Sequence, residues 1–163
     1  MREGLRVWLD DALLTQVRKL CTVAELQLML CGVDEIDVDD WESSTEYRGG
    51  YSEGSPQVQW FWAKVRRMTT EDRSKLLHFC TGSARAPATG FANLMGYAGG
   101  GAMAQQQRFT IERLDVALER LPVASTCFNA LKLPPYTTEN VLVEKLQLVF
   151  EAEGFHEGAI ARS

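Results

Sequence analysis

The chain has 163 residues, of which 45% are hydrophobic and 24% are charged, proportions that are usual for a soluble globular domain. Its formal charge of −5 argues against sequence-independent binding to nucleic acid or to an acidic membrane, because such binding neutralises phosphates with basic side chains. No apolar run approaches the roughly 18 residues that cross a bilayer, and the first residues contain no apolar stretch of secretory-signal length. We therefore expect a soluble protein of the cytoplasm or the nucleus.

The cysteines and histidines do not form a metal-binding pattern. Spacings of 10, 49 and 47 residues separate the four cysteines, which are Cys21, Cys31, Cys80 and Cys127. Neither histidine stands at ligand spacing from another good ligand. Because the sequence shows no secretory signal, the thiols should be reduced. The sequence therefore predicts neither a metal site nor a cofactor.

Three short helices are predicted in the first part of the chain. Asp10 or Asp11 caps the first, a capping box at 22–25 opens the second, and Asp37 caps the third. Isolated helices of this length are marginal in water, so we expect residues 1–50 to be the edge of something larger. The apolar face of these helices would be built from Leu13, Val17, Leu26 and Met29. Such a face promotes association when it is exposed.

Composition and charge change at residues 48–57. Residues 1–55 carry 12 acidic and 5 basic side chains, whereas residues 56–163 carry 10 acidic and 12 basic ones. The intervening stretch RGGYSEGSP combines three glycines with a proline, which is typical of a loop or a hinge. We therefore place a domain boundary at residues 48–57, with a helical segment before it and an α+β segment, residues 58–163, after it.

Helices and short strands are predicted to alternate after this loop. Ser55 and Pro56 should open a helix over residues 57–68, and Thr69 with Asp72 should cap a second helix that ends at Gly82. Alternating apolar and polar residues predict strands at 108–113, 122–128 and 130–133. After the turn at Pro134 and Pro135, Thr138 should cap a final helix of about four turns that ends at Gly154. We expect a small sheet flanked by helices.

Cys127 stands between the last two predicted strands. A thiol on a loop can be reached by a macromolecular substrate. Free cysteine is also among the most buried residue types, so the residues alone leave a core thiol as the alternative.

The sequence around Cys127 resembles the catalytic segment of HECT-type ubiquitin ligases. The resemblance rests first on residues 121–136, LPVASTCFNALKLPPY. Further similar segments follow the order of the family, namely LMLCGVDEIDVDDW at 28–41, QWFW at 59–62, LLHFCTGSARAPATGF at 76–91, KLQL at 145–148 and GF at 154–155.

This resemblance implies a division of labour along the chain. Residues 1–47 correspond to the end of the HECT N-terminal lobe, residues 48–57 to the interlobe hinge and residues 58–163 to the catalytic C-terminal lobe. Cys127 would accept ubiquitin as a thioester from a ubiquitin-conjugating enzyme and pass it to a substrate lysine, chemistry that suits a nucleophilic thiolate. The implied partners are ubiquitin, the conjugating enzyme and a protein substrate, with no nucleic acid and no membrane.

The resemblance also gives supporting roles to residues near the nucleophile. Those expected to support the thioester loop are Ser125, Thr126, Phe128 and Asn129, and those expected to position the ubiquitin tail are Arg85 and Phe155. Ser125 stands where the family commonly has histidine, and eight residues follow Phe155, although its family counterpart lies near the extreme C-terminus. Each role has an alternative: local backbone capping by Thr126 and Asn129, a surface ion pair for Arg85, and core packing for Phe128.

Two other functions fit the same residues. A catalytically degenerate lobe would bind ubiquitin or another partner without turnover, a reading that Ser125 favours. A cysteine protease acting on ubiquitin would need a histidine base, for which the sequence offers only His78 and His156.

Overall fold

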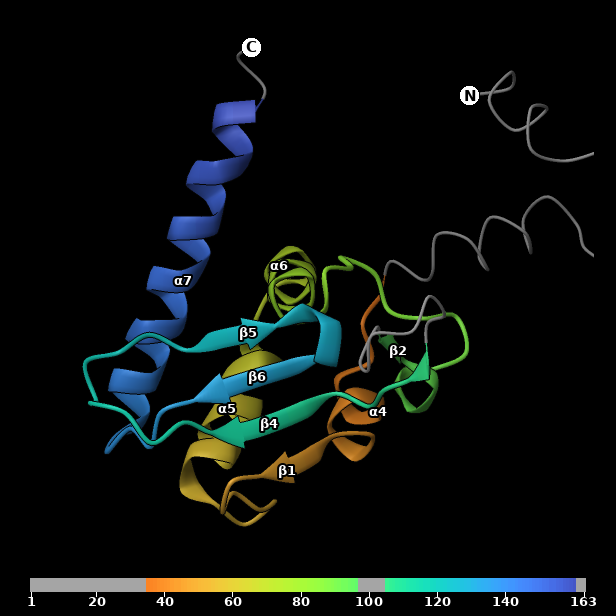
Figure 1. Ribbon diagram of the computed structural model, residues 1–163. Coiled ribbons are helices and arrows are strands. Elements are labelled where there is room, and N and C mark those ends of the chain that lie inside the picture. The colour runs from red at the N-terminus through yellow and green to blue at the C-terminus, as the bar shows by residue number, and fades with distance from the viewer. Residues whose placement is uncertain (1–34, 97–104, 161–163) are drawn as a thin grey trace, which may run out of the picture.

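The computed structural model describes residues 35–96 and 105–160, and side chains as far as Phe150. Within these ranges a four-stranded sheet carries helices on one face, and a two-stranded sheet lies beside it (Figure 1). The helices are α4 (Val38–Ser43), α5 (Pro56–Arg67), α6 (Thr70–Thr81) and α7 (Glu139–Ile160), with short 3-10 helices η1 (Phe91–Asn93) and η2 (Thr126–Phe128). The strands are β1 (Glu46–Arg48), β2 (Met95–Gly96), β3 (Gln105–Gln106), β4 (Thr110–Arg113), β5 (Val123–Ser125) and β6 (Ala130–Leu133). The expected α+β fold class is confirmed.

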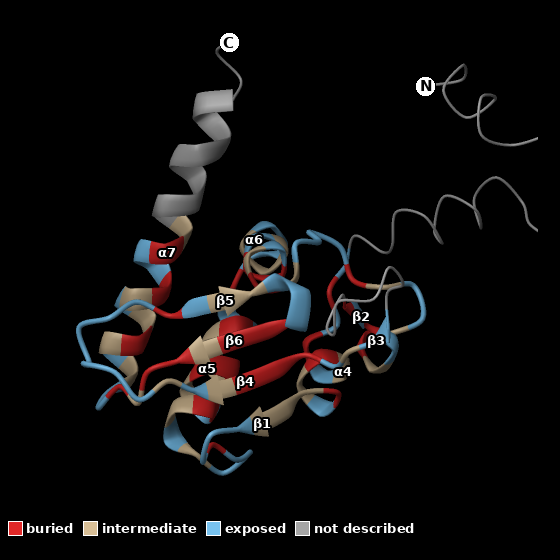
Figure 2. Ribbon diagram, viewed as in Figure 1, coloured by how far each residue is buried: buried red, intermediate tan, exposed pale blue. Residues whose placement is uncertain are grey.

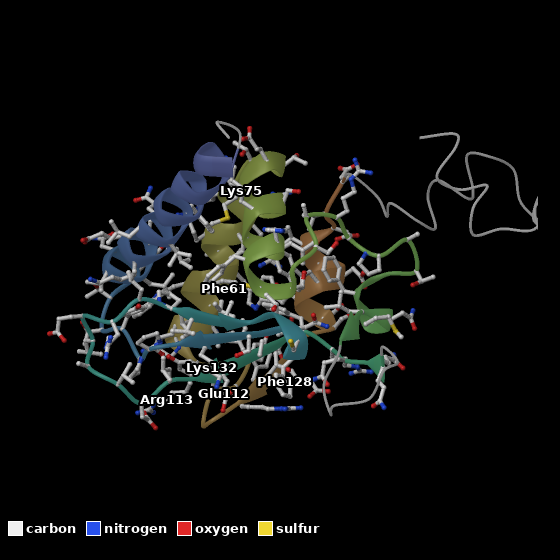
Figure 3. The ribbon with its side chains drawn as sticks, turned by 45° about the horizontal axis from the view of Figure 1, so that its top comes forward. Phe61, Lys75, Glu112, Arg113, Phe128 and Lys132 are labelled. Carbon is white, nitrogen blue, oxygen red and sulfur yellow. The ribbon has the colours of Figure 1, made fainter. Side chains whose placement is uncertain are left out.

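The larger sheet has the strand order β1-β4-β6-β5. Strands β1 and β6 both run parallel to β4, and β5 is antiparallel to β6. Tyr47, Ile111 and Leu131 stand opposite one another in register. Ile111 and Leu131 belong to the hydrophobic core, and Tyr47 packs against it and accepts a hydrogen bond from Trp62 Nε1 of α5 at 3.0 Å. Glu112 and Lys132 are the next pair along the strands and therefore point to the other face, as Figure 3 shows.

Helices α5 and α6 lie within one residue of the predicted bounds. Ser55 is the N-cap of α5, and Pro56 occupies its first position, where a missing N–H costs nothing. At the start of α6, Thr69 Oγ1 accepts a hydrogen bond from the backbone N–H of Asp72 at 3.1 Å. Gly82 ends α6 in the left-handed conformation, with φ 76°, which glycine adopts without strain. Both helix predictions are confirmed.

The buried stretches of chain line the space between the sheet and the helices (Figure 2). The centre of this core is a group of aromatic rings around the fully buried Trp41. Its ring stacks on Phe91 with centroids 5.1 Å apart and meets Trp62 and Phe109 edge to face at 5.7 and 5.2 Å. These neighbours come from η1, from α5 and from the residue before β4. Phe61 and Trp62 are also buried, so α5 contributes two aromatic rings to this core.

The boundary expected at residues 48–57 does not divide the described part of the chain. Ile36, Val38 and Trp41 belong to the same hydrophobic core as the residues after the loop. Strand β1 at the edge of the common sheet is formed by residues 46 and 47, which were expected in the helical segment, and by residue 48, which was expected in the loop. Glycine, serine and proline mark a loop reliably, but they do not reveal whether the segments on its two sides share a core.

Hydrogen bonds also tie this loop to the far end of the sheet. The hydroxyl of Tyr51 donates to the carbonyl oxygen of Pro134 at 3.0 Å, and Gln57 Nε2 donates to the carbonyl oxygen of Tyr136 at 2.8 Å. A pivot at residues 48–57 would have to break these bonds and separate β1 from β4. The described part of the chain is therefore one packed unit across this loop.

Two further elements differ from their predictions. The strand expected over 122–128 is only three residues long, because the chain turns into η2 at Thr126. Helix α7 continues through Gly154 to Ile160, since an internal glycine costs a helix only about 1 kcal/mol and does not forbid it. Thr138 precedes α7, and its Oγ1 accepts a hydrogen bond from the Val141 N–H at 3.4 Å.

Some expectations lie outside the described residues. These are the first two predicted helices and the apolar face formed by Leu13, Val17, Leu26 and Met29, together with Cys21 and Cys31. In the described ranges, no helix combines the length and apolar character that crossing a membrane requires.

Candidate active site

Cys127 is the middle residue of η2, the short turn that connects β5 to β6. Cys127 is exposed to solvent, whereas the other described cysteine, Cys80 in α6, is fully buried. The alternative of a core thiol is therefore wrong for Cys127 and right for Cys80. Because β5 is the edge strand of the sheet, the turn stands at a corner of the molecule where a large substrate can approach.

The backbone of β2 lies directly against the carbonyl group of Cys127. A Cβ atom placed on Gly96 would lie 3.0 Å from the Cys127 carbonyl oxygen and 2.8 Å from Cβ of Gln107. Real Cβ contacts are almost never that short, so only glycine fits without a shift of the surroundings. On the side of α6, a Cβ on Gly82 would meet Thr126 Cβ at an ordinary 3.9 Å. The η2 turn is thus held between the end of α6 and β2.

Asn129, directly after η2, is turned into the protein and is 1% exposed. Its Nδ2 donates to the carbonyl oxygens of Met95 and Gln107, at 3.0 and 2.8 Å. Both amide hydrogens are therefore used by backbone groups, and the side chain is unavailable to a thioester carbonyl at Cys127. The alternative weighed for this residue was local backbone capping. The Asn129 side chain does bond backbone groups, but these lie 34 and 22 residues away in the sequence.

The other expected loop residues differ in exposure. Ser125 ends β5, is half-buried and pairs with Ala130 across the sheet. Thr126 is exposed. Phe128 is 52% exposed, so the alternative of a core aromatic is wrong. Figure 3 shows Phe128 on the side of the sheet that carries Glu112 and Lys132, away from Phe61.

The two residues expected to position a ubiquitin tail lie on different elements. Arg85 is an exposed residue of the loop that follows α6, where its backbone carbonyl accepts a hydrogen bond from Ser83 Oγ at 3.1 Å. Phe155 falls within α7, and its side chain lies outside the described part of the chain. Helix α7 begins after β6, at the end of the sheet away from η2 (Figure 1).

The described residues contain no group of three or more His, Cys, Asp or Glu side chains that could hold a metal ion. What they offer at η2 is an exposed thiol on a turn with a fixed backbone. Sequence reasoning missed Gly96 and Gln107, which hold that turn from β2 and from the residue after β3. A single glycine in a Gly/Ala-rich stretch gives no signal that a backbone carbonyl 31 positions later will rest on it.

Comparison with known proteins places this arrangement in a family. Residues 1–157 match the family model described as HECT-domain (ubiquitin-transferase). The chain belongs to the HECT family. This confirms the family resemblance drawn from the motifs around Cys127, and the α+β fold fits the C-terminal lobe region of a HECT domain.

Several curated HECT relatives are similar over most of the chain. It is 45% identical over 132 residues to the human E3 ubiquitin-protein ligase NEDD4, covering 80% of this chain and 10% of that protein. It is 41% identical over 160 residues to the ligase ptr1 of Schizosaccharomyces pombe, covering 95% and 5%. It is 47% identical over 122 residues to mouse HACE1, covering 75% and 13%. The chain therefore spans only a small part of the length of these HECT relatives.

Proposed function

We propose that this HECT chain is the ubiquitin-accepting part of an E3 ubiquitin-protein ligase and that Cys127 is its acceptor nucleophile. The observation that carries the proposal is the exposure of Cys127 on η2, at the corner of a sheet, in a chain of the HECT family. The relatives named above are all called E3 ubiquitin-protein ligases. The proposed partners are ubiquitin, a ubiquitin-conjugating enzyme and a protein substrate, and the proposed location is the cytoplasm or nucleus.

The proposed reaction has two steps at the same sulfur. The Cys127 thiolate attacks the carbonyl carbon of the thioester between ubiquitin and the conjugating enzyme. A new C–S bond forms, the old C–S bond breaks, and the leaving thiolate takes up the proton that Cys127 released. The neutral amine of a substrate lysine then attacks the carbonyl carbon, so that a C–N bond forms, the bond to Cys127 breaks, and the amine proton restores the thiol.

The proposal makes positioning the main contribution of the protein. Exchange of one thioester for another changes little in bond energy, so the rate depends on bringing the two sulfurs and the carbonyl carbon together. A turn held between α6 and β2 suits that task. Ser125, which replaces the more common histidine, cannot carry a proton charge near neutral pH, so the proposal assigns it no acid–base role.

The test bypasses the conjugating enzyme. The chain is mixed with ubiquitin that carries a small activated C-terminal thioester, and its intact mass is followed with and without reductant. We expect an adduct of one ubiquitin that reductant removes, that Cys127→Ala abolishes and that Cys80→Ala retains. Cys80 is the matched control because it is a thiol of the same chain that is fully buried.

The outcomes separate the rival functions. A folded chain that binds ubiquitin but forms no adduct would overturn the transferase proposal in favour of a binding lobe without turnover. Hydrolysis of the ubiquitin thioester that disappears in His78→Ala or His156→Ala would instead indicate a protease. An adduct that Cys127→Ala fails to remove would show that another residue accepts the ubiquitin.

A further inference from the structure

Asn129 has an unusual backbone conformation for its residue type. With φ 48° and ψ 42° it is the one non-glycine residue at positive φ among residues 35–96 and 105–160. Asparagine tolerates this left-handed conformation better than most residues. The conformation reverses the chain directly after η2, so that β6 can begin at Ala130.

Asn129 connects η2 to three other segments, two through its side chain and one through its backbone. Its amide group donates to Met95 in β2 and to Gln107 after β3, which are 34 and 22 residues away in the sequence. Its backbone N–H donates to the Thr126 carbonyl oxygen at 3.2 Å, and its own carbonyl oxygen accepts from the Thr110 N–H at 3.0 Å. One residue therefore joins η2 to β2, to β4 and to the segment between β3 and β4.

The turn packs between α6 and β2, but its own hydrogen bonds are few. A 3-10 helix of three residues has few internal hydrogen bonds and poorer geometry than an α-helix. The contact between Gly96 and the Cys127 carbonyl oxygen limits movement in one direction only. The two hydrogen bonds of the Asn129 amide, by contrast, tie the residue at the end of η2 to the backbone of two other segments.

We propose that Asn129 is a positioning residue, whose amide fixes the backbone of η2 and so aims the Cys127 thiol at the incoming carbonyl carbon. The proposal rests on the acceptor function of Cys127 proposed above, and it explains how this chain holds the Cys127 sulfur in the place that the reaction requires. Asn129 does not touch ubiquitin or the reacting atoms. It acts through the backbone of residues 126–129, and the required feature is a pair of N–H donors beneath a left-handed turn.

Three substitutions separate the conformational role from the donor role. Asn129→Gly keeps the left-handed conformation and removes both donors. Asn129→Asp keeps the size and the turn preference but places carboxylate oxygens opposite two carbonyl oxygens. Asn129→Ala removes the donors and disfavours the turn. If only backbone conformation mattered, Asn129→Gly would form the adduct as fast as the parent chain. If the amide donors matter, the rate should be highest for the parent chain, lower for Asn129→Gly and lowest for Asn129→Asp.

The measurement is the rate of adduct formation with the activated ubiquitin thioester, at temperatures where circular dichroism shows every variant folded. We expect Asn129→Gly to lower the maximal rate about tenfold or more, because small misplacements of reacting groups cost that much. The half-saturating ubiquitin concentration should stay within about twofold. Alkylation of the exposed Cys127 thiol by iodoacetamide should also change less than about twofold, since a small reagent needs no fixed approach. Asn93→Ala is the matched control, because Asn93 Nδ2 also donates to a backbone carbonyl oxygen, that of Thr89 at 2.8 Å, within the separate segment around η1.

Hydrogen exchange tests the same inference without ubiquitin. Asn129→Gly should speed exchange of the backbone amides of residues 126–129 about tenfold or more and leave α6 unchanged, since local opening is set by local bonds. Gly96→Ala, which presses on η2 from β2, should reproduce the kinetic pattern if Asn129→Gly fails to fold. The proposal would be overturned if folded variants kept the parent's maximal rate of adduct formation and its amide exchange at residues 126–129. It would also be overturned if the rates of alkylation and of adduct formation fell equally. A parent chain without an adduct would overturn the acceptor function instead, and the exchange result would still decide whether Asn129 holds the turn.

Discussion

The two ends of the four-stranded sheet are built in contrasting ways. At the end where the parallel strands begin, the short turn η2 exposes Cys127 and Phe128. Its backbone is held by the hydrogen bonds of Asn129 and by the close approach of Gly96. At the end where those strands finish, Tyr51 and Tyr136 are buried and close the loops with hydroxyl hydrogen bonds to carbonyl oxygens. One end presents an exposed thiol on a turn that is packed between neighbouring elements, and the other end has buried side chains that hydrogen-bond the loops. The contrast predicts that changes at η2 alter reactivity and changes at the far end alter stability.

The largest expected effect is at η2. Cys127→Ala should remove the whole ubiquitin adduct while the free energy of unfolding changes by less than about 0.5 kcal/mol, because exposed side chains contribute little to stability. Intact mass and urea denaturation measure the two quantities on one sample. A large loss of stability in this variant would contradict the division of roles between the two ends.

The core between the two ends should show the opposite pattern. Trp41→Ala removes a fully buried ring that contacts three other aromatic rings and should lower the free energy of unfolding by about 3–5 kcal/mol. Trp60→Ala, at a half-buried position in α5, is the control and should cost clearly less. Equal losses in the two variants, measured by urea denaturation, would show that α4 is not part of the core.

The far end should also respond to alkaline pH. Burial raises the pKa of Tyr51 to about 12 from its ordinary value of 10.0, and burial likewise raises the pKa of Tyr136. The unfolded chain therefore loses these protons at lower pH than the folded chain. The stabilisation is fully present below pH 10 and disappears as the pH rises toward 12, by roughly 2 kcal/mol for Tyr51. Urea midpoints measured from pH 8 to pH 11.5 check this, and Tyr51→Phe should flatten the alkaline part of the curve.

The smallest expected effect comes from one hydroxyl at that end. Tyr136→Phe removes the hydrogen bond from the phenol to the Arg120 carbonyl oxygen, which is 2.6 Å long, and should cost about 1 kcal/mol of stability. The rate of adduct formation at Cys127 should not change. A slower rate at full folding would show that the two ends are coupled through the sheet.

Features fixed by neighbouring residues could be predicted from the sequence. The caps at Asp37 and Thr69 and the end of α6 at Gly82 depend on residues within one helical turn, and the structure has all three. The residues alone left two positions open for Cys127, an accessible loop and the core, and the family resemblance favoured the accessible one.

The remaining features depend on distant partners. The amide of Asn129 is used by carbonyl groups 34 and 22 residues away, and Trp41 meets Phe91 across a loop and two helices. Local patterns cannot show which carbonyl lies nearby after folding. The boundary expected at residues 48–57 was wrong for the same reason, because strand β1 belongs to a sheet whose other strands come more than 60 residues later.

The parallel pairing of β1 with β4 determines where this unit can be cut from a longer chain. A fragment that starts after the glycine-rich loop would lack both β1 and Trp41, and β4 would become an open edge strand beside an emptied core. Open edges of that kind recruit strands from other molecules and lead to aggregation. A fragment that starts before Ile36 keeps the edge covered. A stable fragment that carries Cys127 should therefore begin no later than Ile36, more than ten positions before the loop.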